Sequence, residues 1–180
     1  MKLMFASDIH GSALFCEKML TAYRREGAEK LCLLGDILYH GPRNPLPQGH
    51  DPKSVIAQLN AVKEELLCVR GNCDTEVDQM VLEFPVLADY AVLFVDGISF
   101  FLSHGHHHNP IALPPLKPGD VLINGHTHIP AAFLQGGIHC LNDGSISLPK
   151  ENNPRTYMVY EKGVFTIKTL DGEGFAEYTL

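Results

Sequence analysis

A carboxylate and an imidazole stand two residues apart near the start of the chain, at Asp8 and His10. The residues before them, 2–6, form a short and mostly apolar run that predicts a buried strand. Ser12 then predicts the N-cap of a helix. We therefore expect Asp8 and His10 on the loop at the carboxyl end of a strand, which is the edge at which open α/β sheets bind ligands. Both side-chain types bind divalent metals.

The elements that would position these groups follow a regular order in the first half of the chain. Apolar runs and helical periodicity predict strands at residues 2–6, 30–34 and 66–69, with helices at 13–26 and after the Asp51-Pro52 cap. Such βαβαβ units bring the carboxyl ends of their parallel strands to one edge. The second half predicts a strand at 121–124 and hairpins within 90–103, 131–141 and 156–170, so it should be mainly antiparallel β.

Further polar side chains stand at the ends of predicted strands. With the first two they form one candidate ligand set: Asp8, His10, Asp36, Asn72, His104, His126 and His128. Carboxylates, imidazoles and an amide oxygen suit divalent ions such as Mn, Fe, Zn or Co. Seven ligands exceed what one tetrahedral ion needs. Two ions that share a bridging carboxylate would use them all.

Composition limits the other classes of function. A chain of 180 residues fits a single domain, 1–180. No apolar run approaches the roughly 20 residues of a membrane span, and the first residues do not read as a signal peptide, so we expect a cytoplasmic protein. The net charge of −7 without a basic run argues against an extended nucleic-acid surface. The five cysteines form no CxxC pair and read as reduced thiols. The sequence does not decide whether the chain forms a homo-oligomer.

Five ordered motifs between residues 3 and 150 carry a family resemblance: Asp-x-His, Gly-Asp, Gly-Asn-x-Asp, Gly-His and Gly-His-Thr-His. In this order they resemble the binuclear calcineurin-like metallophosphoesterases. The stretches Gly-Asp-Ile-Leu-Tyr-His-Gly-Pro-Arg-Asn (35–44) and Arg-Gly-Asn-Cys-Asp (70–74) are similar to the small bacterial YfcE-type phosphodiesterases. The resemblance implies an α/β fold, a metallophosphoesterase-type β-sandwich flanked by helices.

The resemblance also implies how the ligands are shared between two divalent ions. Asp8, His10 and His128 would hold one ion, Asn72, His104 and His126 the other, and Asp36 would bridge them. Asp36, Asn72 and His104 are the residues expected to act in catalysis. Mn²⁺ is the expected metal, with Fe, Zn, Co and Ni as alternatives. The charges of two ions, two carboxylates and one bridging hydroxide sum to +1, so an anionic phosphate can bind, and the hydroxide would attack phosphorus in line.

Three residues are expected to contact the substrate. Arg43 would clamp a phosphate oxygen bidentately, unless it is a solvated loop residue. Cys73 stands where many relatives have histidine after the motif asparagine, so it would favour diesters over monoesters, or else only pack beneath the loop. His106 would approach the phosphate.

Two further features concern the surroundings of the ligands. Asp74 would either orient a ligand histidine or cap a helix that starts there. The relatives' Asn-Pro-Gly-Ser is Asn142-Asp143-Gly144-Ser145 here, a change expected to alter a turn rather than the chemistry.

The function predicted is a metal-dependent phosphodiesterase that acts on a small substrate. A phosphomonoesterase on the same site is the alternative. A third interpretation is a non-catalytic scaffold. A retromer subunit of the same fold shows that this sheet can serve protein binding once metal ligands are lost. All seven ligand positions are filled in this chain, which argues against the scaffold.

Overall fold

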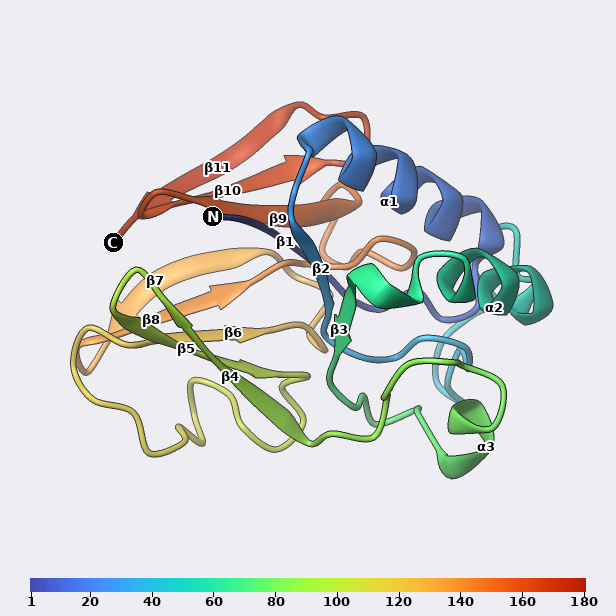
Figure 1. The fold of residues 1–180 in the computed structure, drawn as a ribbon, viewed down its shortest axis with the longest axis horizontal. Helices are drawn as coiled ribbons and strands as arrows, with labels where there is room; N and C mark the ends of the chain where they lie inside the picture. Colours follow the sequence, from blue (N-terminus) through green and yellow to red (C-terminus); the bar gives the residue numbers. More distant parts are fainter.

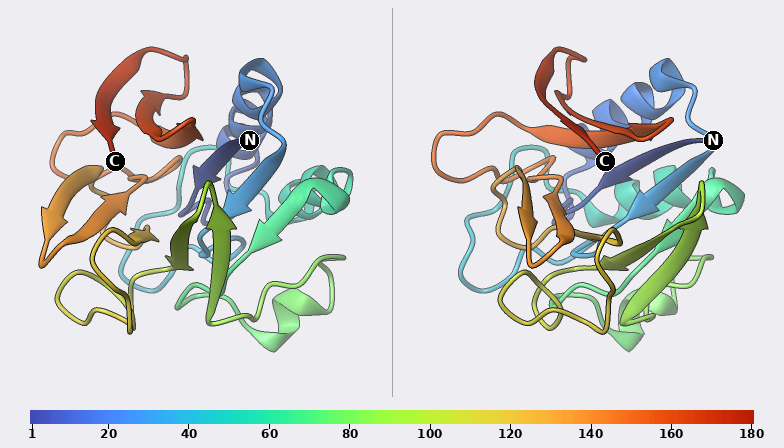
Figure 2. Two further views of the ribbon diagram at one scale, coloured as in Figure 1. Left: turned by 60° about the vertical axis from the view of Figure 1, so that its left-hand side comes forward. Right: turned by 90° about the vertical axis from the view of Figure 1, so that its left-hand side faces the viewer.

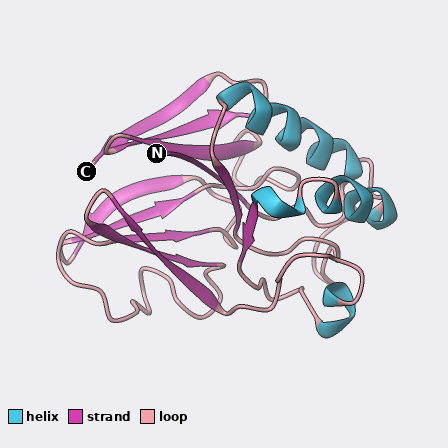
Figure 3. Ribbon diagram, viewed as in Figure 1, coloured by secondary structure: helices cyan, strands magenta, loops and turns pink.

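Two β-sheets lie face to face in the computed structural model, which describes residues 1–180, and helices cover the outer face of one sheet (Figures 1 and 3). The first sheet has the strand order β11-β10-β9-β1-β2-β3 and the second has the order β4-β5-β6-β8-β7. The right-hand view of Figure 2 separates the layers, with β1 and β2 (blue) in one and β4 and β5 (green) in the other. This is the β-sandwich flanked by helices that the family resemblance implied.

The first half contains β1 (Lys2–Ala6), α1 (Ala13–Glu26), β2 (Lys30–Leu33), α2 (Pro52–Asn60), the short 3₁₀ helix η1 (Lys63–Glu65), β3 (Leu66–Cys68) and α3 (Glu76–Gln79). β1 pairs parallel with β2, and β2 with β3. The predicted βαβαβ order is therefore confirmed. β2 and β3 each end one residue earlier than expected.

The second half contains β4 (Tyr90–Val95), β5 (Ile98–Ser103), β6 (Val121–Asn124), β7 (Ala131–Gln135), β8 (Ile138–Asn142), β9 (Thr156–Glu161), β10 (Val164–Thr169) and β11 (Gly174–Thr179). The three predicted hairpins are antiparallel, as expected. The sequence interpretation did not include β11, which adds an antiparallel edge strand to β10.

β6 pairs parallel with both of its neighbours, β5 and β8, inside this mainly antiparallel half. The long connection at 104–120 returns the chain from the end of β5 to the start of β6, so both strands run in the same direction. As a result, the residues that follow β5 and β6 reach the same edge of the second sheet.

β1 shows how one strand serves two cores. Successive side chains of a strand point to opposite faces. Leu3 and Phe5 belong to the core between the two sheets, whereas Met4 and Ala6 pack on the helix side. β1 is thus buried on both faces, which explains its apolar sequence and fixes the position of the loop that follows it.

α1 begins and ends where the sequence predicted. The Ser12 hydroxyl accepts a hydrogen bond from the Phe15 amide, and Gly27 ends the helix in the left-handed conformation at φ 62°. Phe15, Met19 and Tyr23 are buried against the first sheet, which confirms the periodicity. None of the helices combines the length and apolarity that a membrane crossing requires.

Candidate metal centre

All seven predicted ligands lie at one end of the sandwich, where loops from both sheets meet. They follow β1, β2, β3, β5 and β6. The loops after β1 and β2 stay hydrogen-bonded beyond their strands, since the Asp8 amide donates to the Gly35 carbonyl at 3.0 Å and the His10 amide to the Asp36 carbonyl at 2.9 Å. The two sheets are joined here because the His126 amide donates to Asp8 Oδ2 at 3.1 Å.

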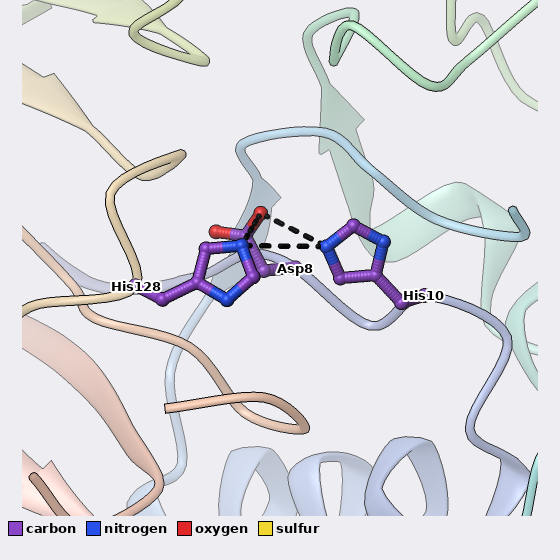
Figure 4. A group of neighbouring side chains, drawn as sticks. All are labelled: Asp8, His10 and His128. Atoms are coloured by element: carbon purple, nitrogen blue, oxygen red, sulfur yellow. Dashed lines mark hydrogen bonds and ion pairs between the residues drawn. The ribbon is translucent and has the colours of Figure 1, made fainter. Parts of the chain in front are cut away.

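Asp8, His10 and His128 form the first group of converging donors (Figure 4). Asp8 Oδ1 lies 3.2 Å from His128 Nε2 and 3.5 Å from His10 Nε2, and the two Nε2 atoms are 3.4 Å apart. Ligand atoms that each lie about 2.1 Å from one ion are roughly 3–3.5 Å from each other. The three atoms therefore have the spacing of a metal site.

His104 is the centre of the second group. Its Nε2 atom lies 3.0 Å from Asn72 Oδ1 and 3.1 Å from His126 Nδ1. Asp36 lies between the two groups, because its Oδ2 atom is 3.5 Å from His104 Nε2 and 3.6 Å from His10 Nε2. A carboxylate in this position can contact two ions at once.

Backbone carbonyls determine which ring nitrogen of three histidines is free to bind a metal. The Nδ1 atoms of His10, His104 and His128 donate to the carbonyls of Tyr39, Leu34 and Leu148 at 2.8, 2.7 and 2.6 Å. A carbonyl only accepts, so Nδ1 carries the proton and Nε2 presents its lone pair to the centre.

One oxygen of Asp8 has no partner of its own. Asp8 is fully buried, and its Oδ2 atom accepts from the Ser7 hydroxyl at 2.7 Å and from the His126 amide. Its Oδ1 atom, which faces His10 and His128, has no hydrogen bond. An unpaired buried carboxylate oxygen costs free energy unless a cation meets it. The donor set and this oxygen therefore fit a divalent ion.

The backbone is left-handed at five of the seven candidates: Asp8, His10, Asp36, His126 and His128 have φ between 49° and 69°. Such a conformation costs on the order of 1–3 kcal/mol for a residue other than glycine and is concentrated at functional sites. Here it alternates along the chain at 8 and 10 and again at 126 and 128. Asp8 and His10 both turn toward the first donor group, whereas His128 joins that group and His126 joins the second.

Gly71 is required by a close approach of two loops. A Cβ atom at this position would lie 2.1 Å from Asp36 Oδ1 and 2.2 Å from the Asp36 amide nitrogen. The glycine lets the loop after β3 pass directly over Asp36. It also explains how the Cys73 amide reaches Asp36 Oδ1, to which it donates at 2.8 Å.

Asp74 fills neither of its two predicted roles. Thr75, not Asp74, is the N-cap of α3. The Asp74 carboxylate accepts hydrogen bonds from the backbone amides of Asp36, Ile37 and Gly71 at 2.7–2.8 Å. Burial raises the pKa of Asp74 to about 6, against these three bonds. Asp74 thus holds the backbone of the loops after β2 and β3, rather than a histidine ring.

Asp143 was expected only to alter a turn, but it lies next to the candidate ligands. The turn exists, because the Gly144 amide donates to Asn142 Oδ1 at 2.9 Å. However, Asp143 is fully buried, and its Oδ1 atom lies 2.9 Å from the Ser7 hydroxyl that donates to Asp8. Burial raises the pKa of Asp143 well above its usual value. A buried acid therefore shares the hydroxyl that supports a candidate ligand.

Protonated histidine partly balances the carboxylates when no metal is bound. Although burial opposes the charged imidazole, hydrogen bonding to Asp36 and the charges of Asp8 and Asp36 raise the pKa of His104 to about 9. Burial and the neighbouring His104 lower the pKa of His106 to about 4, so this ring is neutral. A cation at the centre would replace the His104 proton.

A cavity of about 420 Å³ opens over this centre. Its lining contains four of the candidate ligands (Asp36, Asn72, His126 and His128) and the residues Gly41, Pro42, Arg43, Asn44, Cys73, Thr127 and Lys150. Arg43 and Cys73 were predicted as substrate contacts and line the cavity. His106 does not; its ring lies near those of His104 and His126, at centroid distances of 5.4 and 6.2 Å. Lys150 was not predicted, because no sequence motif includes it.

Comparison with known proteins adds to this geometry. Residues 1–163 match the calcineurin-like phosphoesterase superfamily domain. Phosphodiesterase YfcE from Escherichia coli (strain K12) is 46% identical over 173 residues, which cover 96% of this chain and 94% of that protein.

Solved structures agree in fold. The structure of the E. coli phosphoesterase YfcE superposes with a TM-score of 0.97 at 46% identity, covering 99% of both chains. Vps29 from Entamoeba histolytica, solved with Zn²⁺, superposes with a TM-score of 0.62 at 18% identity over 99% of both chains, a likeness of fold alone. The domain match and the 46% identity over nearly the whole length place this chain in the calcineurin-like phosphoesterase superfamily.

Proposed function

We propose that this chain is a metal-dependent phosphodiesterase with two divalent ions at the candidate centre. The observation that carries the proposal is the position of Asp36 Oδ2, within 3.6 Å of His10 Nε2 on one side and His104 Nε2 on the other. Two donor groups that share one carboxylate suit a pair of ions. The relative with 46% identity is named a phosphodiesterase, which supports the same reaction class.

The proposed ligand assignment follows the two donor groups. Asp8, His10 and His128 hold one ion, and Asn72, His104 and His126 hold the other, with Asp36 shared. The imidazole, carboxylate and amide donors favour Mn²⁺, Fe²⁺ or Zn²⁺, and we propose Mn²⁺. When bound, the ions would lower the pKa of a coordinated water toward about 7 and stabilise charge on the phosphoryl oxygens.

The residues of this chain then orient the substrate. Arg43 lines the cavity and forms no ion pair, so its guanidinium is free to hold a phosphate oxygen in a bidentate contact. The Cys73 amide fixes the Asp36 carboxylate by a hydrogen bond, so Asp36 holds the two proposed ions at a constant position relative to each other. Backbone carbonyls keep the Nε2 atoms of His10, His104 and His128 directed at the centre.

The direct test is hydrolysis of a chromogenic diester such as bis(4-nitrophenyl) phosphate, combined with the metal content of the same purified sample. We expect turnover together with close to two equivalents of divalent metal. Diesterase activity without bound metal would contradict the proposal, and so would a fully loaded protein that hydrolyses neither diesters nor monoesters.

Cys73 is expected to bias the enzyme toward diesters. A monoester carries an additional negative charge and has a poor leaving group, so it needs a general acid more than a nitrophenyl diester does. Cys73 is 8% exposed, and burial raises the pKa of its thiol, so it is a weak acid at neutral pH. Cys73→His should therefore raise the ratio of monoesterase to diesterase activity, by about 100-fold if acid catalysis is fully gained.

The matched control is Cys73→Ser, which removes the thiol without supplying an acid and should leave the ratio where it is. Both substrates are measured under the same metal conditions, and metal occupancy is determined for each variant. An unchanged ratio in a fully occupied Cys73→His enzyme would show that Cys73 only packs beneath the loop.

A further inference from the structure

We propose that Lys150 forms a second anion subsite in the cavity, so that the natural substrate is a phosphodiester that carries a further phosphate group. This inference rests on the proposed function, because the subsite is defined relative to the diester held at the metal centre. The additional phosphate group is a feature of the substrate that none of the seven candidate metal ligands would recognise.

The loop that carries Lys150 is attached to a candidate ligand on both sides. The His128 ring donates from Nδ1 to the Leu148 carbonyl at 2.6 Å, and the Lys150 amide donates to the His128 carbonyl at 3.1 Å. The Lys150 carbonyl in turn accepts from the amide and the side chain of Asn153 at 3.1 and 2.9 Å. The backbone of Lys150 is therefore fixed relative to the centre, although its side chain is exposed.

The charges around the cavity exceed what one diester can balance. Asp36 is the only carboxylate in the lining, while Arg43 and Lys150 are both cationic. Neither cation belongs to any ion pair of the structure. With a bridging hydroxide, the two divalent ions, Asp8 and Asp36 would sum to +1, which matches the single charge of a diester, so Arg43 and Lys150 both exceed it. Arg43 is assigned to an oxygen of the diester phosphate. Lys150 remains, and its positive charge attracts a second anionic group.

The size of the cavity agrees with a substrate larger than one phosphoryl group. Its volume of about 420 Å³ falls within the roughly 300–1,000 Å³ of sites that enclose whole small molecules. The loop that contains Arg43 and the loop that contains Lys150 both contribute to its wall. The protein is acidic overall, with 21 acidic and 14 basic residues, so two unpaired cations in one cavity indicate a specific anionic ligand rather than a general affinity for nucleic acid.

A pair of substrates that differ only in the remote phosphate tests the subsite. The 5′-(4-nitrophenyl phosphate) of thymidine and its 3′-phosphorylated form have the same diester and the same leaving group. We expect the wild-type enzyme to prefer the 3′-phosphorylated form by about fivefold in kcat/KM, mainly through KM, because one exposed ion pair contributes at most about 1 kcal/mol. Lys150→Met should reduce this preference to near one, and Lys150→Arg should keep it.

Lys18→Ala is the matched control, because it removes the same charge from an exposed position of α1. It should leave the preference unchanged. Metal content is measured for every variant, so that a loss of ions is not mistaken for a loss of the subsite.

Calorimetric titration with the reaction products gives a readout that does not depend on turnover. Thymidine 3′,5′-bisphosphate should bind more tightly than thymidine 5′-phosphate to the wild type, and equally to Lys150→Met. Glycerol 1,3-bisphosphate in the same titration separates recognition of the second phosphate from recognition of a nucleoside.

A wild-type enzyme without preference, or a preference that survives in Lys150→Met, would overturn the subsite. Hydrolysis of neither ester would contradict the proposed function instead, and the titration would then decide whether Lys150 binds the second phosphate.

Discussion

Asp36→Asn is expected to lower kcat/KM for a diester by more than about 100-fold, because loss of an outer partner of a metal ligand alone costs 10–100-fold and Asp36 is proposed as a shared ligand. The loss should remain at saturating Mn²⁺. Stopped assays across a range of Mn²⁺ concentrations measure it, with the metal content of each sample determined in parallel.

The physical reason lies in the two oxygens of this carboxylate. Asp36 Oδ1 accepts from the Cys73 amide at 2.8 Å, so an asparagine would keep its carbonyl oxygen there. Its NH₂ group would then occupy the place of Oδ2, 3.5 Å from His104 Nε2 and 3.6 Å from His10 Nε2. A hydrogen-bond donor would face the centre, so the substitution removes a negative charge and a shared lone pair together.

Asp51→Asn provides the matched control. Asp51 is exposed and caps α2 by accepting from the Ser54 amide, a role that asparagine fills equally well. It should retain full activity. The expectation fails if Asp36→Asn keeps activity within about threefold of wild type at limiting metal. Such a small ratio means that almost no transition-state stabilisation is lost, so Asp36 would not be shared between two ions.

Removal of divalent metal by a chelator is expected to abolish hydrolysis while the fold survives. The two hydrophobic cores pack without contribution from the centre, so circular dichroism should keep its native form at room temperature. Readdition of Mn²⁺ should restore activity. Ligand binding at 100 times its dissociation constant adds about 2.7 kcal/mol, which corresponds to a rise in Tm of roughly 5–11 °C for a chain of this size.

The affinity for metal should increase with pH. Because Asp36 and Asp8 raise the pKa of His104 to about 9, the ring carries a proton at neutral pH in the metal-free protein. A bound ion has to displace this proton, so binding is opposed below that pKa and the opposition disappears as the pH rises through it. The apparent affinity should rise by up to about tenfold per pH unit below 9.

Two results would contradict these expectations for the metal. Cooperative unfolding of the chelated protein at room temperature would show that the ions are structural. An apparent affinity that stays constant between neutral pH and 9 would show that no proton of the centre competes with the metal.

The sequence by itself determined the βαβαβ order of β1 to β3 and the identity of the candidate ligands. Apolar strands such as residues 2–6 and the capped helix after Ser12 follow from local periodicity and capping, which depend on neighbours in the chain. Parallel strands of βαβ units end at one edge, so Asp8, Asp36 and Asn72 could be placed together from the pattern alone.

Only the tertiary structure decided how His104 and His126 of the second sheet reach the candidate metal centre. The long 104–120 connection makes β5 and β6 parallel, which brings His104 and His126 to the same edge. Local patterns do not encode this pairing, because the register of a strand depends on partners far away in sequence. β11 was not predicted for the same reason. It is an exposed edge strand without an apolar pattern, and its pairing with β10 determines its structure.

The contacts that orient the ligands are also tertiary. Asp74 bonds to backbone amides on the preceding loop, Asp143 meets Ser7 across 136 residues, and Lys150 enters the cavity because its loop is bonded to His128. Each contact joins groups from segments that are distant in the chain, so neither spacing nor periodicity could predict it. Residue types thus specified the candidate ligands, whereas the packing of two sheets specified where each of them points.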